Sequence, residues 1–167
     1  MAKISYSALE TFRTCPLKYK FAYVDKIPVH QNGAMQFGSV IHKVMEELYA
    51  HQMLPITKEE LQHIFSSRWK PELYGDNTYQ AQYDFQSGLD IIAREWDKKQ
   101  LEPEPTTIGR EKYFLLPIAE GFELSGRIDR IDKVGEDSLE IIDYKTGRTV
   151  PTDEEVRNNL QLSIYYL

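Results

Sequence analysis

The sequence is poor in cysteine and has no long hydrophobic run. Its single cysteine, Cys15, cannot form a disulfide within the chain, which agrees with a reducing compartment. No apolar segment approaches the roughly 20 residues that a membrane-spanning helix needs. The first six residues, MAKISY, also lack the apolar core of a signal peptide. We therefore expect a cytoplasmic protein without a membrane partner.

Positive charge is also scarce, because 20 lysines and arginines against 26 aspartates and glutamates give a net charge of −6. Proteins that coat nucleic acid by charge alone usually carry a basic face, so the balance argues against that class. It does not exclude a nuclease, because bound metal neutralises acids locally. One early segment is both basic and aromatic, and it is open to two interpretations: a surface on which bases stack, or a helix with inward rings and solvated charges. Its members are Phe12, Arg13, Lys18, Tyr19, Lys20, Phe21, Tyr23 and Lys26.

The first part of the chain has helical spacing of its apolar residues. With 167 residues, 41% of them hydrophobic, the chain is large enough for one domain over residues 1–167. Ser7 with Glu10 predicts a capping box at the start of a short helix. Pro16 either ends that helix or is the first residue of the next one. Apolar periodicity and a second capping box, Thr57 with Glu60, predict longer helices over residues 37–53, 57–69 and 79–100.

After the prolines at positions 103 and 105 the apolar period changes to two, which is typical of strands. The alternation predicts a meander of three strands over residues 110–118, 122–132 and 138–145. A last helix is expected from Thr152 to Leu167. Helices and strands together predict an α/β protein with a helical insertion.

The third predicted strand carries an acid and a lysine two residues apart. Successive side chains of a strand alternate between the faces of the sheet, so Asp143 and Lys145 point the same way. The second predicted strand carries Asp129, which lies next to Asp143 if these two strands pair. Two carboxylates with a lysine are the set that a divalent-metal phosphodiesterase needs.

These residues belong to a longer series of motifs that covers nearly the whole chain. In chain order the motifs are Ser5-Tyr-Ser-Ala-Leu9, Cys15-Pro-Leu-Lys-Tyr19, Phe37-Gly-Ser-Val-Ile-His42, Glu111-x-x-Phe114, Gly126-Arg-Ile-Asp-Arg130, Ile142-Asp-Tyr-Lys-Thr-Gly147 and Gln161-x-x-x-Tyr165. In this order the sequence resembles the RecB-like exonuclease family of the PD-(D/E)xK nuclease superfamily. The resemblance implies a restriction-endonuclease-like core, in which helices flank a central mixed sheet.

The resemblance also implies a metal site. His42, Asp129 and Asp143 match the family's metal ligands, and Lys145 matches the lysine of its signature. Asp129, Asp143 and Lys145 are therefore the expected catalytic residues. Oxygen ligands suit Mg²⁺ or Mn²⁺, and the imidazole of His42 shifts the preference toward Mn²⁺. Lys145 is suited to orient water or to stabilise charge in the transition state.

The implied function is metal-dependent hydrolysis of DNA, as an exonuclease in DNA repair or recombination. Gln161 and Tyr165 match residues that position DNA beside the metal, and a helicase or a recombination protein is a candidate partner. The alternative is a DNA-binding or assembly module of a helicase–nuclease complex that no longer cleaves. Such modules are expected to lose the acids or the lysine, and this chain keeps both.

Several of these residues also have simpler interpretations. Asp129 can pair with Arg127 or Arg130 as a solvated ion pair, which contributes little stability. Asp143 can cap the turn at residues 146–147, and Asp132 is expected to play a similar part after its strand.

Roles are also expected for three further residues, two of which have alternatives. Glu46 follows His42 by one helical turn, and it is either an added ligand or a surface partner of Lys43. Glu111 is expected to buttress Arg127 across the strand pair. Tyr165 either contacts DNA or packs in the core.

The cysteines depart from the family pattern. In many relatives an iron–sulfur cluster is held by an early cysteine, in a context like Cys15-Pro16, and by three more after the last core helix. This chain has only the first. One expectation is a chain that lacks its C-terminal strand and tail, with a 4Fe–4S cluster only in the full-length protein. The other is a member without a cluster, in which Cys15 is a small buried residue.

Overall fold

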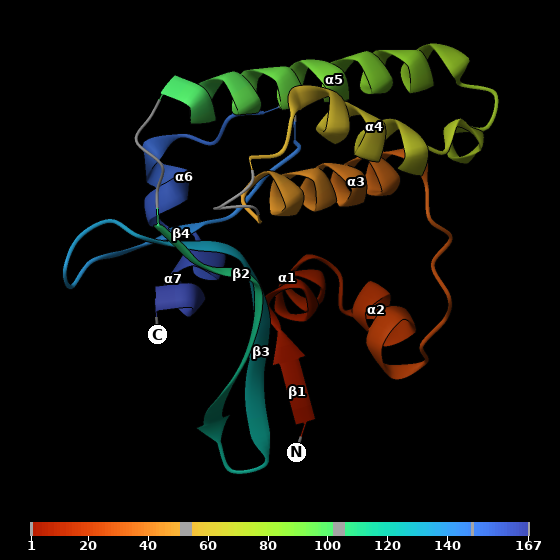
Figure 1. Cartoon of the computed structure of the whole chain (residues 1–167). Coiled ribbons are helices and arrows are strands. Elements are labelled where there is room, and N and C mark those ends of the chain that lie inside the picture. The colour runs from red at the N-terminus through yellow and green to blue at the C-terminus, as the bar shows by residue number, and fades with distance from the viewer. Residues whose placement is uncertain (1, 51–54, 102–105, 148, 167) are drawn as a thin grey trace. The chain divides into compact units, whose positions relative to one another are not determined.

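A computed structural model describes residues 2–50, 55–101, 106–147 and 149–166 (Figure 1). The chain divides into two compact units. The first unit comprises residues 1–30, 111–128 and 147–167, and the second comprises residues 31–110 and 129–146. None of the helices within the described ranges has the length and apolar character needed to cross a membrane.

Within the described ranges, four strands form one mixed sheet: β1 (Ala2–Ser5), β2 (Thr106–Ala119), β3 (Phe122–Lys133) and β4 (Leu139–Ile142). β3 is the central strand and lies beside β2. Its first residues pair with β1 in parallel, and its last residues pair with β4 in antiparallel fashion. The predicted α/β class with a mixed sheet is confirmed, and so is the order of the three strands in the meander.

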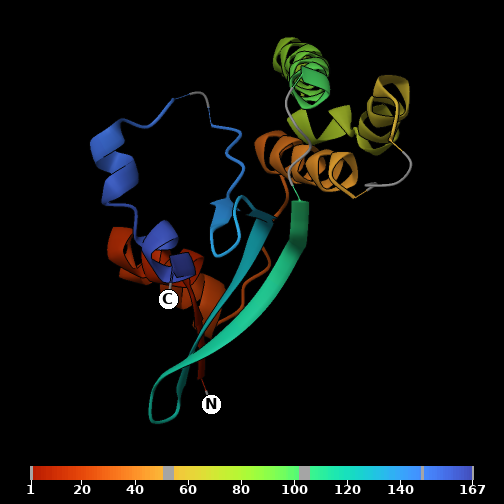
Figure 2. The same cartoon turned by 60° about the vertical axis from the view of Figure 1, so that its left-hand side comes forward.

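The second unit is built on three helices, α3 (Gly33–Leu48), α4 (Lys58–Arg68) and α5 (Thr78–Leu101), which pack against one another (Figure 2). A short 3₁₀ helix, η2 (Pro71–Tyr74), lies between α4 and α5 in the sequence. The contact between the helices is apolar, and Val44, Leu61 and Phe65 are fully buried in it. Burial of this stripe, rather than intrinsic propensity, is what stabilises helices of this length.

Side-chain caps decide where these helices begin. The helix predicted over residues 37–53 starts four residues earlier, because the Oδ1 atom of Asn32 accepts a hydrogen bond from the Met35 amide at 3.0 Å. This helix ends at Leu48 with Tyr49 as its C-cap, so the prediction that it extends to about residue 53 is wrong, although residues 51–54 themselves lie outside the described residues. The predicted capping box of Thr57 and Glu60 is confirmed.

The first unit contains the helices α1 (Tyr6–Thr14), α2 (Pro16–Tyr19), α6 (Asp153–Arg157) and α7 (Leu160–Tyr166), and a π-helical turn, η1 (Lys20–Val24). The predicted capping box at Ser7 is wrong, because Ser5 caps α1 by accepting a hydrogen bond from the Ala8 amide at 3.2 Å. Pro16 is the first residue of α2, as predicted.

The aromatic residues near the start of the chain pack mainly on one another. Tyr19 stacks on Tyr23 with ring centroids 5.1 Å apart, and Phe12 meets Tyr19 edge-on. Phe12 and Tyr23 remain exposed. The described structure therefore does not bury these rings as the inward face of an ordinary helix.

Two predicted elements of the C-terminal part differ from the structure. The helix expected over residues 152–167 is divided into α6 and α7, because the side chain of Asn159 accepts a hydrogen bond from the Leu162 amide at 3.1 Å and starts a new helix. The strand expected over residues 138–145 ends at Ile142. Beyond that point the Tyr144 amide donates to the carboxylate of Asp129, so this amide takes no part in the strand ladder.

Gly88 of α5 offers a test of the helix packing. A Cβ atom at this position would lie 2.7 Å from Cε2 of the Phe65 ring and closer still to Cζ. We expect Gly88→Ala to lower the free energy of unfolding by about 1–3 kcal/mol through overpacking. Helix propensity alone predicts the opposite, a gain of about 1 kcal/mol. Urea denaturation beside the exposed control Gln82→Ala measures this, and a stabilised Gly88→Ala variant would contradict the packing.

Candidate metal centre

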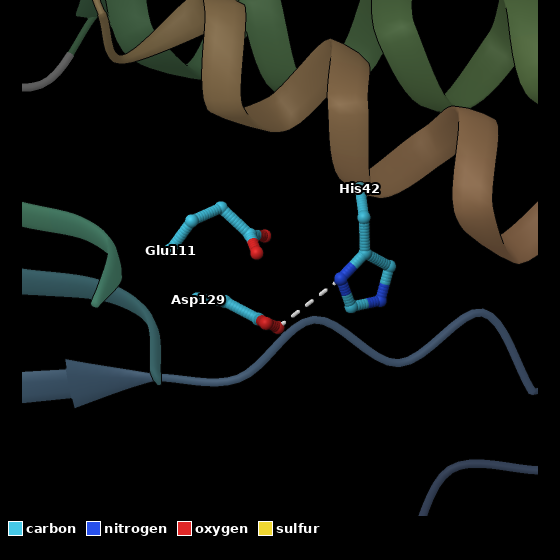
Figure 3. Close-up of side chains that lie close together, drawn as sticks. All are labelled: His42, Glu111 and Asp129. Carbon is cyan, nitrogen blue, oxygen red and sulfur yellow. Dashed lines mark ion pairs between the residues drawn. The ribbon is translucent and has the colours of Figure 1, made fainter. Parts of the chain in front are cut away.

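His42 and Asp129 meet in the second unit, where they come from a helix and a strand. His42 lies on α3 and its Nδ1 atom is 3.4 Å from Oδ2 of Asp129 on β3 (Figure 3). The side chain of His42 is 32% exposed and that of Asp129 is 10% exposed. The imidazole is therefore accessible from solvent, while the carboxylate is shielded.

Helical periodicity explains why His42 is presented in this way. Its neighbours Ile41 and Val44 are buried against the other helices and fix α3 along its apolar face. His42 lies at the edge of that face, so a rigid helix holds its backbone while the ring stays accessible.

Asp129 is held by the segment that follows β4. The Tyr144 amide donates a hydrogen bond to Oδ2 of Asp129 at 2.7 Å. In the ladder Arg130 pairs with Ile142, the last residue of β4, and Asp143 follows directly in the chain. The two strands therefore pair as the sequence predicted.

Lys145 and Asp143 form an ion pair in the irregular segment after β4. Nζ of Lys145 is 2.6 Å from Oδ2 of Asp143, and their side chains are 58% and 9% exposed. Their proximity agrees with the prediction, although they lie beyond the strand in which they were expected. The ammonium group is exposed to solvent, while its carboxylate partner is shielded.

The donor set fits a divalent cation. With metal–ligand bonds of about 2.1 Å, two ligand atoms at a right angle are about 3 Å apart. The separation of 3.4 Å between Nδ1 of His42 and Oδ2 of Asp129 is close to that spacing. Asp143, the third ligand expected from the sequence, lies just beyond the last residue of β4. His42 and Asp129 are therefore spaced as two ligands of one metal ion would be.

Glu111, which Figure 3 also labels, belongs to the first unit. Its carboxylate accepts a hydrogen bond from Nη1 of Arg127 at 3.2 Å, which confirms the predicted contact across the strand pair. Its φ angle of +47° is uncommon for a residue other than glycine.

The two aspartates of β3 have different partners. Asp129 pairs with His42, while Arg130 lies 2.9 Å from Asp132. The expectation that Asp132 follows its strand is wrong, because Asp132 lies within β3, is fully buried and accepts a hydrogen bond from Thr107 at 2.8 Å. An acid can be buried at this position because both a cation and a hydroxyl contact it.

Glu46 behaves as a surface residue. It lies 2.8 Å from Nζ of Lys43, and Glu47 lies at the same distance from that atom. The hydrogen bonds from Lys43 to Glu46 and Glu47 raise the pKa of Lys43. Glu46 therefore takes the second of its two predicted roles, a surface partner of Lys43.

Gln161 and Tyr165 lie together on α7 in the first unit. Nε2 of Gln161 donates to the Tyr165 hydroxyl at 2.7 Å, and that hydroxyl donates to the Arg127 carbonyl at 2.8 Å. The ring of Tyr165 packs edge-on against Phe114, with centroids 5.9 Å apart. Tyr165 thus packs with its ring and forms hydrogen bonds with its hydroxyl.

Cys15 lies between α1 and α2, where its sulfur accepts a hydrogen bond from the Lys18 amide at 3.5 Å. It is partly exposed. The chain has no second cysteine, so its residues do not fit a four-cysteine iron–sulfur cluster.

The sequence assigned no role to Tyr144, which contacts both members of the His42–Asp129 pair. Its amide binds Asp129, and its ring meets the His42 ring edge-on with centroids 6.1 Å apart. Burial raises the pKa of its phenol well above the ordinary value, so the phenol stays protonated at neutral pH. The only signal in the sequence was its position between Asp143 and Lys145.

The fold and the site together indicate a class of protein. Residues 3–167 match the model of the PD-(D/E)XK nuclease superfamily, and the chain belongs to that superfamily. The predicted restriction-endonuclease-like α/β class is thereby confirmed.

The chain is also similar to one of the subunits of the ATP-dependent helicase/deoxyribonuclease of Streptococcus pyogenes. The proteins of serotype M49 (strain NZ131) and serotype M12 (strain MGAS2096) are each 29% identical to it over 153 residues. The alignment covers 87% of this chain but 14% of each relative. These relatives confirm the predicted RecB-like affiliation.

Metal binding without DNA tests the pair of His42 and Asp129. We expect His42→Ala to raise the dissociation constant for Mn²⁺ by more than about 10-fold. Loss of a residue that only contacts a ligand already lowers metal affinity by about 10-fold or more, and loss of a ligand should cost more. Titration calorimetry of the metal-free protein measures this. His63→Ala is the matched control, because His63 is exposed on α4 of the same unit. Equal affinities in the His42→Ala variant and the unmodified protein would exclude His42 as a ligand.

Proposed function

We propose that the chain is a divalent-metal-dependent deoxyribonuclease that acts as an exonuclease in DNA repair or recombination. The observation that carries the proposal is the arrangement of His42 with Asp129 and of Asp143 with Lys145, in one unit of a chain from a nuclease superfamily. His42, Asp129 and Asp143 hold Mg²⁺ or Mn²⁺. The imidazole nitrogen favours Mn²⁺, since Mg²⁺ prefers oxygen ligands alone.

The bound metal supplies two effects: it lowers the pKa of a water molecule and neutralises charge on the scissile phosphate. The protein groups provide orientation and electrostatics. Asp129 is kept in place by the Tyr144 amide, 2.7 Å away. Lys145 presents an exposed ammonium group that stabilises the charge developing on the phosphate. Asp143 holds that ammonium group near the site.

Gln161 and Tyr165 are proposed to position the DNA strand. The name of the relatives joins a helicase to a deoxyribonuclease. We therefore propose that a helicase or recombination protein supplies DNA to this domain. The single cysteine agrees with a cytoplasmic location, where thiols stay reduced.

Cleavage of end-labelled DNA tests the activity and its polarity. Single- and double-stranded substrates labelled at either end are incubated with Mn²⁺, Mg²⁺ or EDTA. We expect metal-dependent cleavage, reduced by about 10²–10³-fold in Lys145→Ala, as for the loss of one transition-state donor. Lys133→Ala is the control, because Lys133 is an exposed lysine at the end of β3 in the same unit.

Each outcome of this assay has a defined meaning. Undiminished cleavage by Lys145→Ala would contradict the role of the lysine. Tight DNA binding without cleavage by the unmodified protein would favour the alternative, a non-cleaving DNA-binding or assembly module.

The proposed DNA contact of Tyr165 is tested by removing its hydroxyl. Tyr165→Phe keeps the ring on Phe114 and loses the bonds to Gln161 and Arg127. We expect the KM for DNA to rise about 3–10-fold, which corresponds to one net hydrogen bond, with kcat nearly unchanged. Tyr166→Phe changes the exposed neighbour and serves as the control. An unchanged KM with a lower melting temperature would assign the hydroxyl to packing alone.

A further inference from the structure

The segment that carries Asp143 and Lys145 lies outside the strand ladder. β4 ends at Ile142, and residues 143–147 have no regular secondary structure. Backbone pairing therefore does not fix these two side chains. A site that binds a metal ion needs its ligands held within a fraction of an ångström, so other contacts must hold this segment.

Tyr144 provides two such contacts on the side of the proposed metal. Its amide donates to Oδ2 of Asp129 at 2.7 Å, and its ring lies edge-on to the His42 ring. The backbone and the side chain of one residue thus touch both members of the His42–Asp129 pair. Any shift of Tyr144 displaces Asp143 and Lys145 as well, because they are its neighbours in the chain.

A third contact holds the outer end of Tyr144. Its hydroxyl accepts a hydrogen bond from Nη1 of Arg130 at 3.0 Å. Arg130 follows Asp129 in β3, and adjacent side chains of a strand point to opposite faces. Tyr144 therefore binds Asp129 with its backbone and Arg130 with its side chain, and so connects the segment to both faces of β3.

The guanidinium group of Arg130 is itself held firmly. Its carbon Cζ lies 3.6 Å from the centroid of the Tyr49 ring, and Nη2 lies 2.9 Å from Oδ2 of Asp132. The side chains of Arg130 and Asp132 are 11% and 0% exposed. Asp132 in turn accepts a hydrogen bond from Thr107. The guanidinium group is planar, so its contacts with the Tyr49 ring and with Asp132 fix the direction in which Nη1 points.

A buried ion pair of this kind is weak evidence for stability. Its desolvation cost often exceeds the attraction between the charges, and apolar residues of the same volume often serve stability equally well. A positioning role accounts better for the pair of Arg130 and Asp132, because Nη1 of Arg130 donates to the hydroxyl of Tyr144.

We propose that Tyr144 is a positioning residue, which Arg130 anchors so that the segment with Asp143 and Lys145 stays aligned with Asp129. This inference rests on the proposed function, since the alignment serves the metal ion. Tyr144 does not itself coordinate the metal. It acts through the carboxylate of Asp129 and through the neighbouring residues of its own segment.

Tyr144→Phe tests the proposal, because it keeps the amide and the ring and removes only the hydroxyl. We expect the dissociation constant for Mn²⁺, measured by calorimetry, to rise by about 10-fold or more, as for the loss of an outer-shell partner. In the metal-free protein we expect the amide at position 144 to exchange its hydrogen faster by a similar factor, measured by NMR. Tyr79→Phe, at an exposed position of α5 in the same unit, is the control.

A second variant identifies the partner. Arg130→Lys keeps the charge but loses the rigid fork. If both residues act through one hydrogen bond, the variant with both changes loses no more Mn²⁺ affinity than the more severe single variant. Effects that multiply instead would show that Arg130 acts on the metal independently of Tyr144, and would overturn the proposed anchor.

The remaining outcomes separate this proposal from the function on which it rests. If the unmodified protein binds no Mn²⁺, the proposed metal-dependent function fails, and the exchange rates of the metal-free protein still decide whether Arg130 anchors the segment. If the unmodified protein binds Mn²⁺ while Tyr144→Phe changes neither affinity nor exchange, the positioning role is overturned. A lower melting temperature with unchanged affinity would likewise overturn it, because the hydroxyl would then serve only stability.

Discussion

The hydrogen bond from the Tyr144 amide to the carboxylate of Asp129 is the contact on which the arrangement of the site depends. A shielded carboxylate needs donors in place of water, and this amide is one of them. Because the amide is used in this way, it is not available to β4, and the strand ends at Ile142. One bond therefore orients a proposed metal ligand, ends a strand and places Asp143 and Lys145 outside the ladder.

The helices of the second unit provide the rigid support for the other side of the site. Val44, Leu61 and Phe65 are fully buried between α3, α4 and α5. Close packing of this kind transmits displacement rather than absorbing it. His42, at the edge of the packed face of α3, is consequently held by its backbone while its ring meets Asp129 at 3.4 Å. Apolar burial fixes the polar pair, although neither member of the pair belongs to the core.

Local patterns in the sequence predicted the elements whose cause is local. The capping box of Thr57 and Glu60 and the alternation along β3 both depend on near neighbours, and both were found. The end of β4 and the burial of Asp132 were predicted wrongly, because each depends on a distant partner. Asp132 is buried beside Thr107, which lies 25 residues earlier in the chain. Of the site, the pairing of β3 with β4 was predictable from the alternation of the two segments, whereas the contacts of Tyr144 were not.

The exposures of the proposed catalytic groups follow from what each group must do. A ligand has to keep one position while a metal ion binds, which favours shielded carboxylates such as Asp129 and Asp143, 10% and 9% exposed. A group that stabilises charge on a substrate has to remain reachable, and the side chain of Lys145 is 58% exposed. Such an exposed side chain would by itself be too mobile for electrostatic preorganisation. Its ion pair with the shielded Asp143 reconciles the two demands, because the carboxylate restricts the ammonium group without covering it. The ion pair with Asp143 therefore restricts the motion of the Lys145 side chain. The position of Asp143 depends in turn on the contacts of its neighbour Tyr144.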